Sequence, residues 1–346
     1  MSGEPMTSAP PLLAVERLAV SFGTDRGAFA AVSDVSFTLR RGETLAVVGE
    51  SGSGKSVTSL AVMGLLPKAP GCRVSGAIRL AGAGGATRDL LGLGEEAMRG
   101  VRGKDIAMVF QEPMTSLNPV KTIGGQITEA IRLHRPMDRR AAEDEACRLL
   151  DLVGIPAPRQ RLAAYPHQLS GGMRQRVMIA MALAGEPSIL IADEPTTALD
   201  VTIQAQILDL IRRLQEATGM AVMFITHNLG VVAEIADRVM VMYAGRVVEQ
   251  ADVRPLFKAP LMPYTAGLLG SVPRLDLAGR RSGALAAIAG NVPDPRFPPP
   301  GCAFHPRCPS SLAGRCDVEP PALDETAEGR HVRCLRWREL SARAAP

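Results

Sequence analysis

Apolar positions in the first third of the chain recur with the period of β-strands. Between Leu12 and Phe22 and between Val32 and Leu39, apolar and polar residues alternate, which is typical of half-buried antiparallel strands. Shorter apolar runs follow and predict further strands. The strands expected here are 12–22, 32–39, 45–48, 74–80 and 106–110. Asp25-Arg26-Gly27 is expected to form the loop between the first two.

The pattern is helical over the middle of the chain, from Ser116 to Glu186. It is clearest in Ile123–Leu133 and Arg139–Val153. A further helix is expected to begin at Ser170 and to run to Ala184. Two shorter helices, at 57–66 and 95–101, are expected before this region.

Strands and helices then alternate until the composition changes near residue 255. Strands are expected at 188–192 and 221–226, a helix at 201–217 and a hairpin at 239–248. Apolar strands that alternate with helices indicate an α/β fold with a mostly parallel sheet covered on both faces. After residue 255, prolines multiply and the periodicity weakens.

These changes of pattern predict the organisation of the chain. Residues 1–11 are expected to be a disordered lead. Residues 12–254 are expected to form one α/β domain, with an antiparallel β subdomain at its start and an α-helical insert at about 112–186. Residues 255–346 form a C-terminal extension that bears a group of cysteines.

Composition narrows the class of protein. The chain has 346 residues, 46% hydrophobic but only 3% aromatic, so aliphatic side chains and Met must fill the core. A net charge of +4 is too small to indicate a nucleic-acid partner. No apolar run reaches the length of a membrane span, and Met1–Pro11 lacks the layout of a signal peptide. We therefore expect a cytoplasmic protein that reaches a membrane only through partners.

The first candidate site is the Gly-rich turn after the strand at 45–48. It reads Gly49-Glu50-Ser51-Gly52-Ser53-Gly54-Lys55-Ser56, the phosphate-loop pattern G-x-x-x-x-G-K-[ST] between a strand and a helix. Glycines let backbone N–H groups turn toward phosphate oxygens, Lys55 supplies charge for the β- and γ-phosphates, and the Ser56 hydroxyl can bind Mg²⁺. A flexible Gly/Ser turn is the alternative. The strand–turn–helix context favours a site for a nucleoside triphosphate.

Two adjacent carboxylates, Asp193 and Glu194, follow the buried strand at 188–192. Ligands of open α/β sheets bind at this end of the strands. Asp193 is suited to contact Mg²⁺, and Glu194 to orient and polarise an attacking water. A helix N-cap cluster before Pro195 is the alternative.

A second Gly-rich segment, Leu169-Ser170-Gly171-Gly172-Met173, begins the helix at 170–184. Ser170 is suited to cap that helix, and the glycines expose its first N–H groups to an anion. This segment occurs in one chain with the phosphate loop, Gln111, Ile189-Leu190-Ile191-Ala192-Asp193-Glu194-Pro195, Ala198-Leu199-Asp200 and His227. With these motifs the chain resembles the nucleotide-binding subunits of ABC transporters over roughly residues 12–250.

The resemblance implies a P-loop NTPase fold of the ABC ATPase type and a role for each motif. Two such domains pair head to tail, so that each ATP lies between one phosphate loop and Ser170, Gly171 and Gly172 of the other chain. Asp200 is expected to shape that contact. Gln111 is expected to contact Mg²⁺ and the attacking water, and His227 the γ-phosphate. Phe22 is expected to stack on adenine, with core packing as the alternative. No catalytic position departs from the family pattern.

Several stretches are similar to the ATPases of oligopeptide and dipeptide importers in particular. They are Met173–Leu183, Phe110–Pro119, Pro263-Tyr264-Thr265 and 301–309, with one small departure at Met262, where relatives commonly carry His. This resemblance implies peripheral attachment to the cytoplasmic face of a bacterial inner membrane. The implied partners are a second related ATPase (forming a heterodimer, with this chain as the first of the pair), two membrane permease subunits and an extracytoplasmic solute-binding protein.

Four of the six cysteines, Cys302, Cys308, Cys316 and Cys334, lie in the extension. A Pro-rich segment of weak periodicity cannot bury much core, so four thiols there require an explanation. The close C-x₂₋₄-C pair of zinc sites and the ferredoxin spacing are both absent. The importer resemblance implies a [4Fe–4S] cluster in some members. Zinc, with His305 or His331 as substitute ligands, and plain thiols remain alternatives.

Two other classes of function are alternatives to the importer ATPase. A soluble ABC ATPase that acts on DNA or the ribosome would usually show paired domains, a coiled-coil insertion or a strong basic patch. A regulatory metal-binding protein with a vestigial ATPase would show a damaged Lys55, Glu194 or His227. The sequence shows none of these features, and it does not specify the transported substrate.

Overall fold

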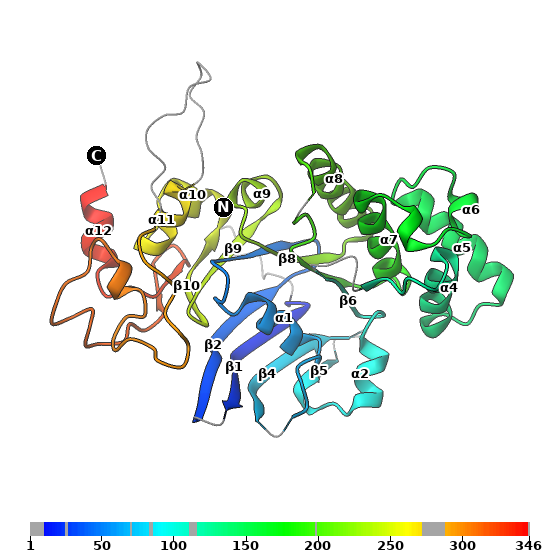
Figure 1. Ribbon diagram of the computed structural model, residues 1–346. Coiled ribbons are helices and arrows are strands. Elements are labelled where there is room, and N and C mark those ends of the chain that lie inside the picture. The colour runs from blue at the N-terminus through cyan, green and yellow to red at the C-terminus, as the bar shows by residue number, and fades with distance from the viewer. Residues whose placement is uncertain are drawn as a thin grey trace, which may run out of the picture.

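The computed structural model describes residues 10–24, 27–69, 71–82, 86–110, 116–197, 199–271 and 288–344. Its architecture is α/β, as expected, with two sheets at the centre and helices around them (Figure 1). Residues 1–9 of the expected disordered lead lie outside the described residues, as do Asp25 and Arg26 of the expected first loop. Within the described ranges, no helix is long and apolar enough to cross a membrane.

The N-terminal sheet is antiparallel, with its described strands in the order β2-β1-β4-β5. The strands are β1 (Leu13–Thr24), β2 (Gly27–Leu39), β4 (Cys72–Ala81) and β5 (Thr87–Asp89). β2 begins before the expected Val32 because the ladder continues to the tip of the hairpin, where Thr24 faces Gly27. Phe22 faces Phe29 in this ladder, and their ring centroids lie 5.8 Å apart. Such aromatic cross-strand pairs stabilise a hairpin.

The second sheet has its described strands in the order β11-β12-β10-β9-β3-β8-β7-β6. Strands β3, β6, β7, β8 and β9 run parallel, and β10 returns antiparallel to β9. Their bounds are β3 (Thr44–Val48), β6 (Ile106–Val109), β7 (Ile189–Asp193), β8 (Ala221–Thr226), β9 (Arg238–Tyr243) and β10 (Arg246–Asp252). The expected mostly parallel sheet and its terminal hairpin are confirmed.

Both faces of this sheet are covered. In β7, Ile189 and Ile191 point into the core shared with the N-terminal sheet, whereas Leu190 and Ala192 point into the core under the helical insert. Continuous apolar strands therefore have a partner on each side, which is the reason for their lack of alternation.

The described helices account for most of the expected helical segments. They are α1 (Lys55–Val62), α2 (Glu95–Val101), α4 (Ile123–His134), α5 (Arg139–Leu152), α6 (Pro158–Arg161), α7 (Gly171–Leu183), α8 (Val201–Thr218), α9 (Leu229–Ile235), α10 (Val253–Lys258), α11 (Pro263–Gly270) and α12 (Trp337–Ala344). Short 3₁₀ turns occur at Leu90–Gly92, Pro166–Gln168 and His305–Arg307. Helix α1 ends before the expected Leu66, and Gly64 follows with a φ of 60°.

The helical insert begins each of its main helices on a side chain suited to that position. Thr122, Asp138 and Ser170 each accept a backbone N–H from the first turn of α4, α5 and α7. These helices gather at one end of the molecule, and α11 and α12 lie at the other (Figure 1).

The C-terminal extension is joined to the main sheet. Strand β12 (His331–Val332) pairs with β10, and β11 (Asp324–Glu325) pairs with β12. These strands have two residues each, which is too short for any periodicity to predict. Tyr264 and Phe304 of the extension share a buried cluster with Val241 and Tyr243 of β9.

Candidate nucleotide-binding site

The phosphate loop connects β3 to α1, as expected. All five residues of β3 are buried, so the loop leaves the sheet at its centre. A Cβ on Gly49 would lie 2.2 Å from the carbonyl oxygen of Met242, and one on Gly54 would lie 2.9 Å from that of Ala31. The glycines are therefore required by the packing of the loop. The Ser53 hydroxyl is buried and has no hydrogen-bond partner in the described part of the chain, which fits a loop built to receive phosphate oxygens.

Lys55 is buried at the start of α1. Its ammonium donates to the carbonyl oxygens of Gly49 at 2.8 Å and of Glu50 at 3.0 Å. Burial lowers the pKa of Lys55, and nearby carboxylates, Glu194 first among them, act in the opposite direction. The charge is thus held inside the loop, where phosphates would lie.

Ser56 and Asp193, both expected to contact Mg²⁺, lie in contact with each other. The Ser56 hydroxyl donates to a carboxylate oxygen of Asp193 at 3.2 Å. Burial raises the pKa of Asp193. A hydroxyl beside a desolvated carboxylate suits a hard cation such as Mg²⁺, which prefers oxygen ligands.

Glu194 and His227 lie together, although they follow different strands. The Nδ1 atom of His227 is 3.2 Å from Oε1 of Glu194, and the Thr197 hydroxyl donates to Oε2 at 2.9 Å. Burial acts to raise the pKa of Glu194, but these hydrogen bonds outweigh it and the pKa is lowered overall. The carboxylate is therefore ionised and oriented, as a residue that polarises water requires. No motif in the sequence indicates a role for Thr197.

The segment Ser170-Gly171-Gly172 lies at the N-terminus of α7, beside α8. The Ser170 hydroxyl accepts the Met173 N–H at 3.3 Å, and Asp200 caps α8 in the same way at 2.9 Å. A Cβ on Gly172 would lie 2.7 Å from a methyl group of Ile203, so this glycine permits the close approach of the two helices. Ser170 and Gly171 are exposed, and α7 lies apart from α1 in Figure 1.

Two further residues, Phe22 and Gln111, were expected at this site. Phe22 lies in β1, half-buried against the N-terminal core and Phe29. Its packing therefore agrees with the alternative interpretation as well as with the expected stacking on adenine. Gln111 lies outside the described residues.

The extension reaches the phosphate loop, a contact that no motif in the sequence indicates. The Glu50 N–H donates to the Tyr264 hydroxyl at 2.9 Å. Arg307 donates to both carboxylate oxygens of Glu50, at 2.7 and 2.9 Å. Both residues belong to stretches with importer resemblance, but their contacts join positions more than two hundred residues apart, which one sequence cannot reveal.

The cysteines of the extension are buried or half-buried and unpaired by disulfides. Burial raises the pKa of Cys302 and Cys308, and that of Cys334 to about 11. The other three thiols add to the rise at Cys334, so the four lie within electrostatic range of one another. The described residues contain no group of three or more His, Cys, Asp or Glu side chains placed to hold a single metal ion.

Comparisons with known protein families and proteins identify the family of the chain. The ABC transporter family matches residues 32–197, and the oligopeptide/dipeptide transporter C-terminal region matches residues 248–316. A peptide import ATP-binding protein of Brucella abortus (strain 2308) is 56% identical over 97% of this chain and 100% of its own. The dipeptide transport ATP-binding protein DppD of Bacillus subtilis (strain 168) is 53% identical over 93% of this chain and 94% of its own.

Solved structures agree as well. The dimeric structure of MJ0796, a bacterial ABC transporter cassette, has a TM-score of 0.60 and 28% identity, over 70% of this chain and 99% of that one. The structure of cbiO1 from Clostridium perfringens, part of the cbiONQ transporter complex, has a TM-score of 0.59 and 27% identity, over 72% and 92% of the two chains. The chain belongs to the ABC transporter family, in the branch with an oligopeptide/dipeptide C-terminal region. It is an ATP-binding subunit of the transport ATPase type.

Proposed function

We propose that the chain hydrolyses ATP to power the uptake of di- and oligopeptides, or of related small solutes, across a bacterial inner membrane. The observation that carries the proposal is the similarity along nearly the whole chain, extension included, to proteins described as peptide and dipeptide import ATP-binding proteins. In this proposal residues 12–254 are the nucleotide-binding domain, and residues 255–346 are the importer-type extension.

The proposed reaction centre combines residues at the ends of strands of the main sheet with Phe22 of the N-terminal sheet. Residues 49–56 hold the phosphates, with Phe22 at the adenine, and Ser56, Asp193 and Gln111 hold Mg²⁺. Glu194 polarises the attacking water, and His227 contacts the γ-phosphate. The 3.2 Å contacts Ser56–Asp193 and Glu194–His227 support these assignments, because each joins residues that the roles require to be adjacent.

The site is proposed to be completed by a second, related ATPase. Ser170 and Gly171 are exposed at the end of α7, apart from the phosphate loop of the same chain. A helix N-terminus with free N–H groups suits the phosphates of a nucleotide bound to another chain. Asp200, which caps the neighbouring helix α8, would lie at the same contact.

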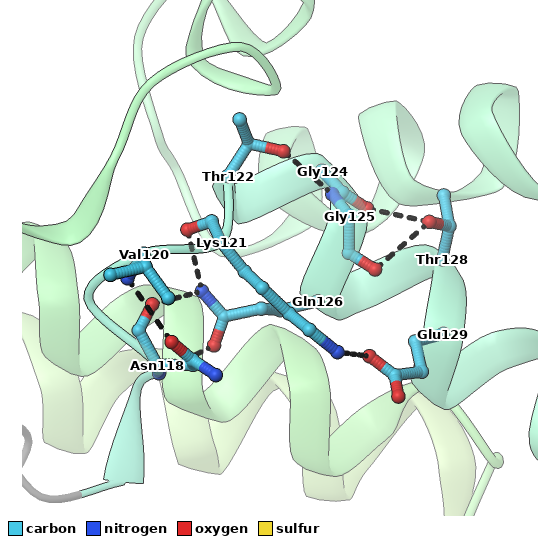
Figure 2. Close-up of polar contacts among 9 residues, drawn as sticks. All are labelled: Asn118, Val120, Lys121, Thr122, Gly124, Gly125, Gln126, Thr128 and Glu129. Carbon is cyan, nitrogen blue, oxygen red and sulfur yellow. Dashed lines mark hydrogen bonds and ion pairs between the residues drawn. The ribbon is translucent and has the colours of Figure 1, made fainter.

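Membrane permease subunits are proposed to dock on the helical insert, at the cytoplasmic face of the membrane. A groove of about 880 Å³ is lined by α4, α5 and α6, with Gly125, Thr128 and Leu162 in its wall. Figure 2 shows the start of α4 and the loop before it, from Asn118 to Lys121. A partner helix in the groove would therefore contact the start of α4, which follows this loop. An extracytoplasmic solute-binding protein would deliver the cargo.

The four cysteines of the extension are proposed to hold a [4Fe–4S] cluster. All four are unpaired, and the sulfurs of Cys316 and Cys334 each accept a backbone N–H at 3.4 Å. Fe–S clusters are held by four thiolates and tuned by such hydrogen bonds. Iron analysis and visible absorbance of the anaerobically purified chain test this. A colourless chain loaded with zinc would contradict it.

Purification of the tagged full-length chain from native membranes tests the transport function. Two multi-span membrane proteins and a second ABC ATPase are expected to co-purify. In proteoliposomes, peptide-loaded binding protein should stimulate ATP hydrolysis by this complex. The Lys55→Ala chain is the control, because it should assemble normally and hydrolyse no ATP. Recovery with DNA or ribosomes and without membrane proteins would contradict the proposal.

A further inference from the structure

Every polar group of Glu50 makes a hydrogen bond, either to the extension or within the phosphate loop. Its carboxylate accepts hydrogen bonds from Arg307 of the extension, and its N–H donates to the hydroxyl of Tyr264, also in the extension. Its carbonyl oxygen accepts from the ammonium of Lys55 at 3.0 Å. Glu50 is therefore a direct physical link between the extension and the lysine of the phosphate loop.

Arg307 is held rigidly on the extension side. Its side chain is only 4% exposed, and its Nε donates to the carbonyl oxygen of Ala289 at 3.0 Å. The guanidinium also lies over the Tyr243 ring, 5.9 Å from the centroid. A two-pronged Arg–carboxylate pair fixes orientation as well as distance, so Arg307 determines where the Glu50 side chain lies.

The residues around this pair add to its rigidity. Tyr243, Tyr264 and Phe304 form a trio of rings with centroids 4.6 to 5.3 Å apart. Phe304 immediately precedes the 3₁₀ turn His305–Arg307, which lies between Cys302 and Cys308. The same packed cluster that carries the cysteine segment thus supports both side chains that contact Glu50.

We infer that Arg307 and Tyr264 are positioning residues of the nucleotide site: they hold Glu50, and through its carbonyl Lys55, in the arrangement that binds MgATP. The extension is then a component of the ATP site and not only an appendage of the domain. The inference rests on the proposed site at residues 49–56, although neither Arg307 nor Tyr264 touches the nucleotide in it.

Equilibrium binding of MgATP to the full-length chain tests the inference. Arg307→Met removes the two-pronged pair and should weaken MgATP binding about tenfold, with Arg307→Lys in between. Arg315→Met is the matched control. This extension arginine donates to Glu339 and to the Leu335 carbonyl, away from the loop, so its loss should leave the affinity unchanged.

A double-mutant cycle separates positioning from general stability. If Arg307 acts through Glu50, then Arg307→Met and Glu50→Gln should not be additive, and the double variant should bind MgATP about as weakly as either single variant. Additive effects, or an Arg307→Met chain that binds within twofold of the unmodified chain, would overturn the inference. Should Arg307→Met not fold, Tyr264→Phe replaces it, and unchanged affinity in that variant has the same meaning. Lys55→Ala tests the site itself, since retained binding there would refute the location of the nucleotide and not the positioning role.

Discussion

Glu194 has an unusual backbone at the point where the proposed chemistry takes place. Its φ is 47°, a left-handed conformation that costs a residue with a side chain about 1–2 kcal/mol. Its N–H donates to the carbonyl oxygen of Ile225 at 2.9 Å, which ties it to the neighbouring strand. This backbone conformation directs the carboxylate toward His227 and Thr197. The strain lowers the local stability, but it fixes the orientation of the side chain.

Replacement of Glu194 tests its role as the residue that polarises water. Glu194→Gln keeps the size of the side chain but removes the charge, so ATP hydrolysis should fall by about 10²–10⁴-fold while ATP still binds. An ATP-bound dimer should then accumulate in gel filtration. Thr197→Val, which removes only one hydrogen bond to Glu194, is expected to reduce the rate by less than about tenfold. Normal turnover in Glu194→Gln would assign the chemistry to another group.

At the scale of elements, the helical insert is organised by a few polar side chains inside an otherwise apolar core. Gln126 of α4 is buried, and its amide accepts the Asn118 N–H at 2.8 Å and donates to the carbonyl oxygens of Asn118 and Lys121 at 3.1 Å. Figure 2 shows this side chain pointing from the helix to the loop. One residue thereby connects α4 to the segment that follows Gln111.

Loss of the Gln126 amide should loosen this loop. Gln126→Leu leaves the loop groups without their partner and should destabilise the chain by about 1–3 kcal/mol. Amide hydrogen exchange of residues 118–121 should become faster. Glu129→Gln is the control shown in the same figure, because its pair with Lys121 is exposed and contributes little. Equal exchange in both variants would show that Gln126 does not hold the loop.

The ion pairs of Glu145, in α5 of the same insert, indicate that the stability of the fold depends on pH. Hydrogen bonds from Arg148 first, and then Arg135, lower the pKa of Glu145 to about 2. Because the pKa is depressed in the folded chain, its stabilisation is fully present above the ordinary value near 4.5 and is lost as the pH falls from there toward 2. Glu145→Gln should therefore reduce stability at pH 7 by about 1 kcal/mol and flatten its decline below pH 4.5. Urea unfolding at pH 7 and at a pH below 4.5 measures the stability of the variant. Asp209→Asn, on the exposed face of α8, is the control at each pH.

At the scale of the whole molecule, a buried ion pair joins the extension to the main sheet. Glu249 of β10 is fully buried and accepts hydrogen bonds from Arg330 at 2.8 Å and from the N–H groups of Leu261 and Met262 at 2.9 and 3.0 Å. All of these donors belong to the extension. Arg333 adds a contact from the extension to Asp34 of the N-terminal sheet at 3.1 Å.

Removal of Arg330 should separate the extension from the domain. Arg330→Met leaves a buried carboxylate without its counter-charge, which costs about 3–5 kcal/mol. Chemical unfolding should show this loss, and protease should cleave the extension sooner. Arg296→Met, in an exposed pair with Asp294, should change neither. Unfolding of Arg330→Met at the same denaturant concentration as the unmodified chain would contradict the prediction.

Much of this molecule was predictable because its signals are local. The strand–loop–helix at 44–62, the apolar strands β7 and β8, and the cap Ser170 depend on residues adjacent in sequence. Contacts made by single polar side chains were not predictable, whether they join near residues or distant ones. Thr197 at Glu194, Gln126 at its loop and Arg307 at Glu50 have no pattern of their own, because one polar side chain leaves no period in a sequence.

The phosphate loop shows the division most clearly. The sequence by itself determined where this loop lies and that it is suited to phosphate. A turn that wraps phosphate between a strand and a helix admits few residues other than its glycines, Lys55 and Ser56. Only the tertiary structure decided what holds that turn in place. The strand order brings β9 beside β3, and the extension then packs on β9, so that Tyr264 and Arg307 meet Glu50. These contacts depend on the tertiary packing of distant segments, and no local stretch of the sequence specifies that packing.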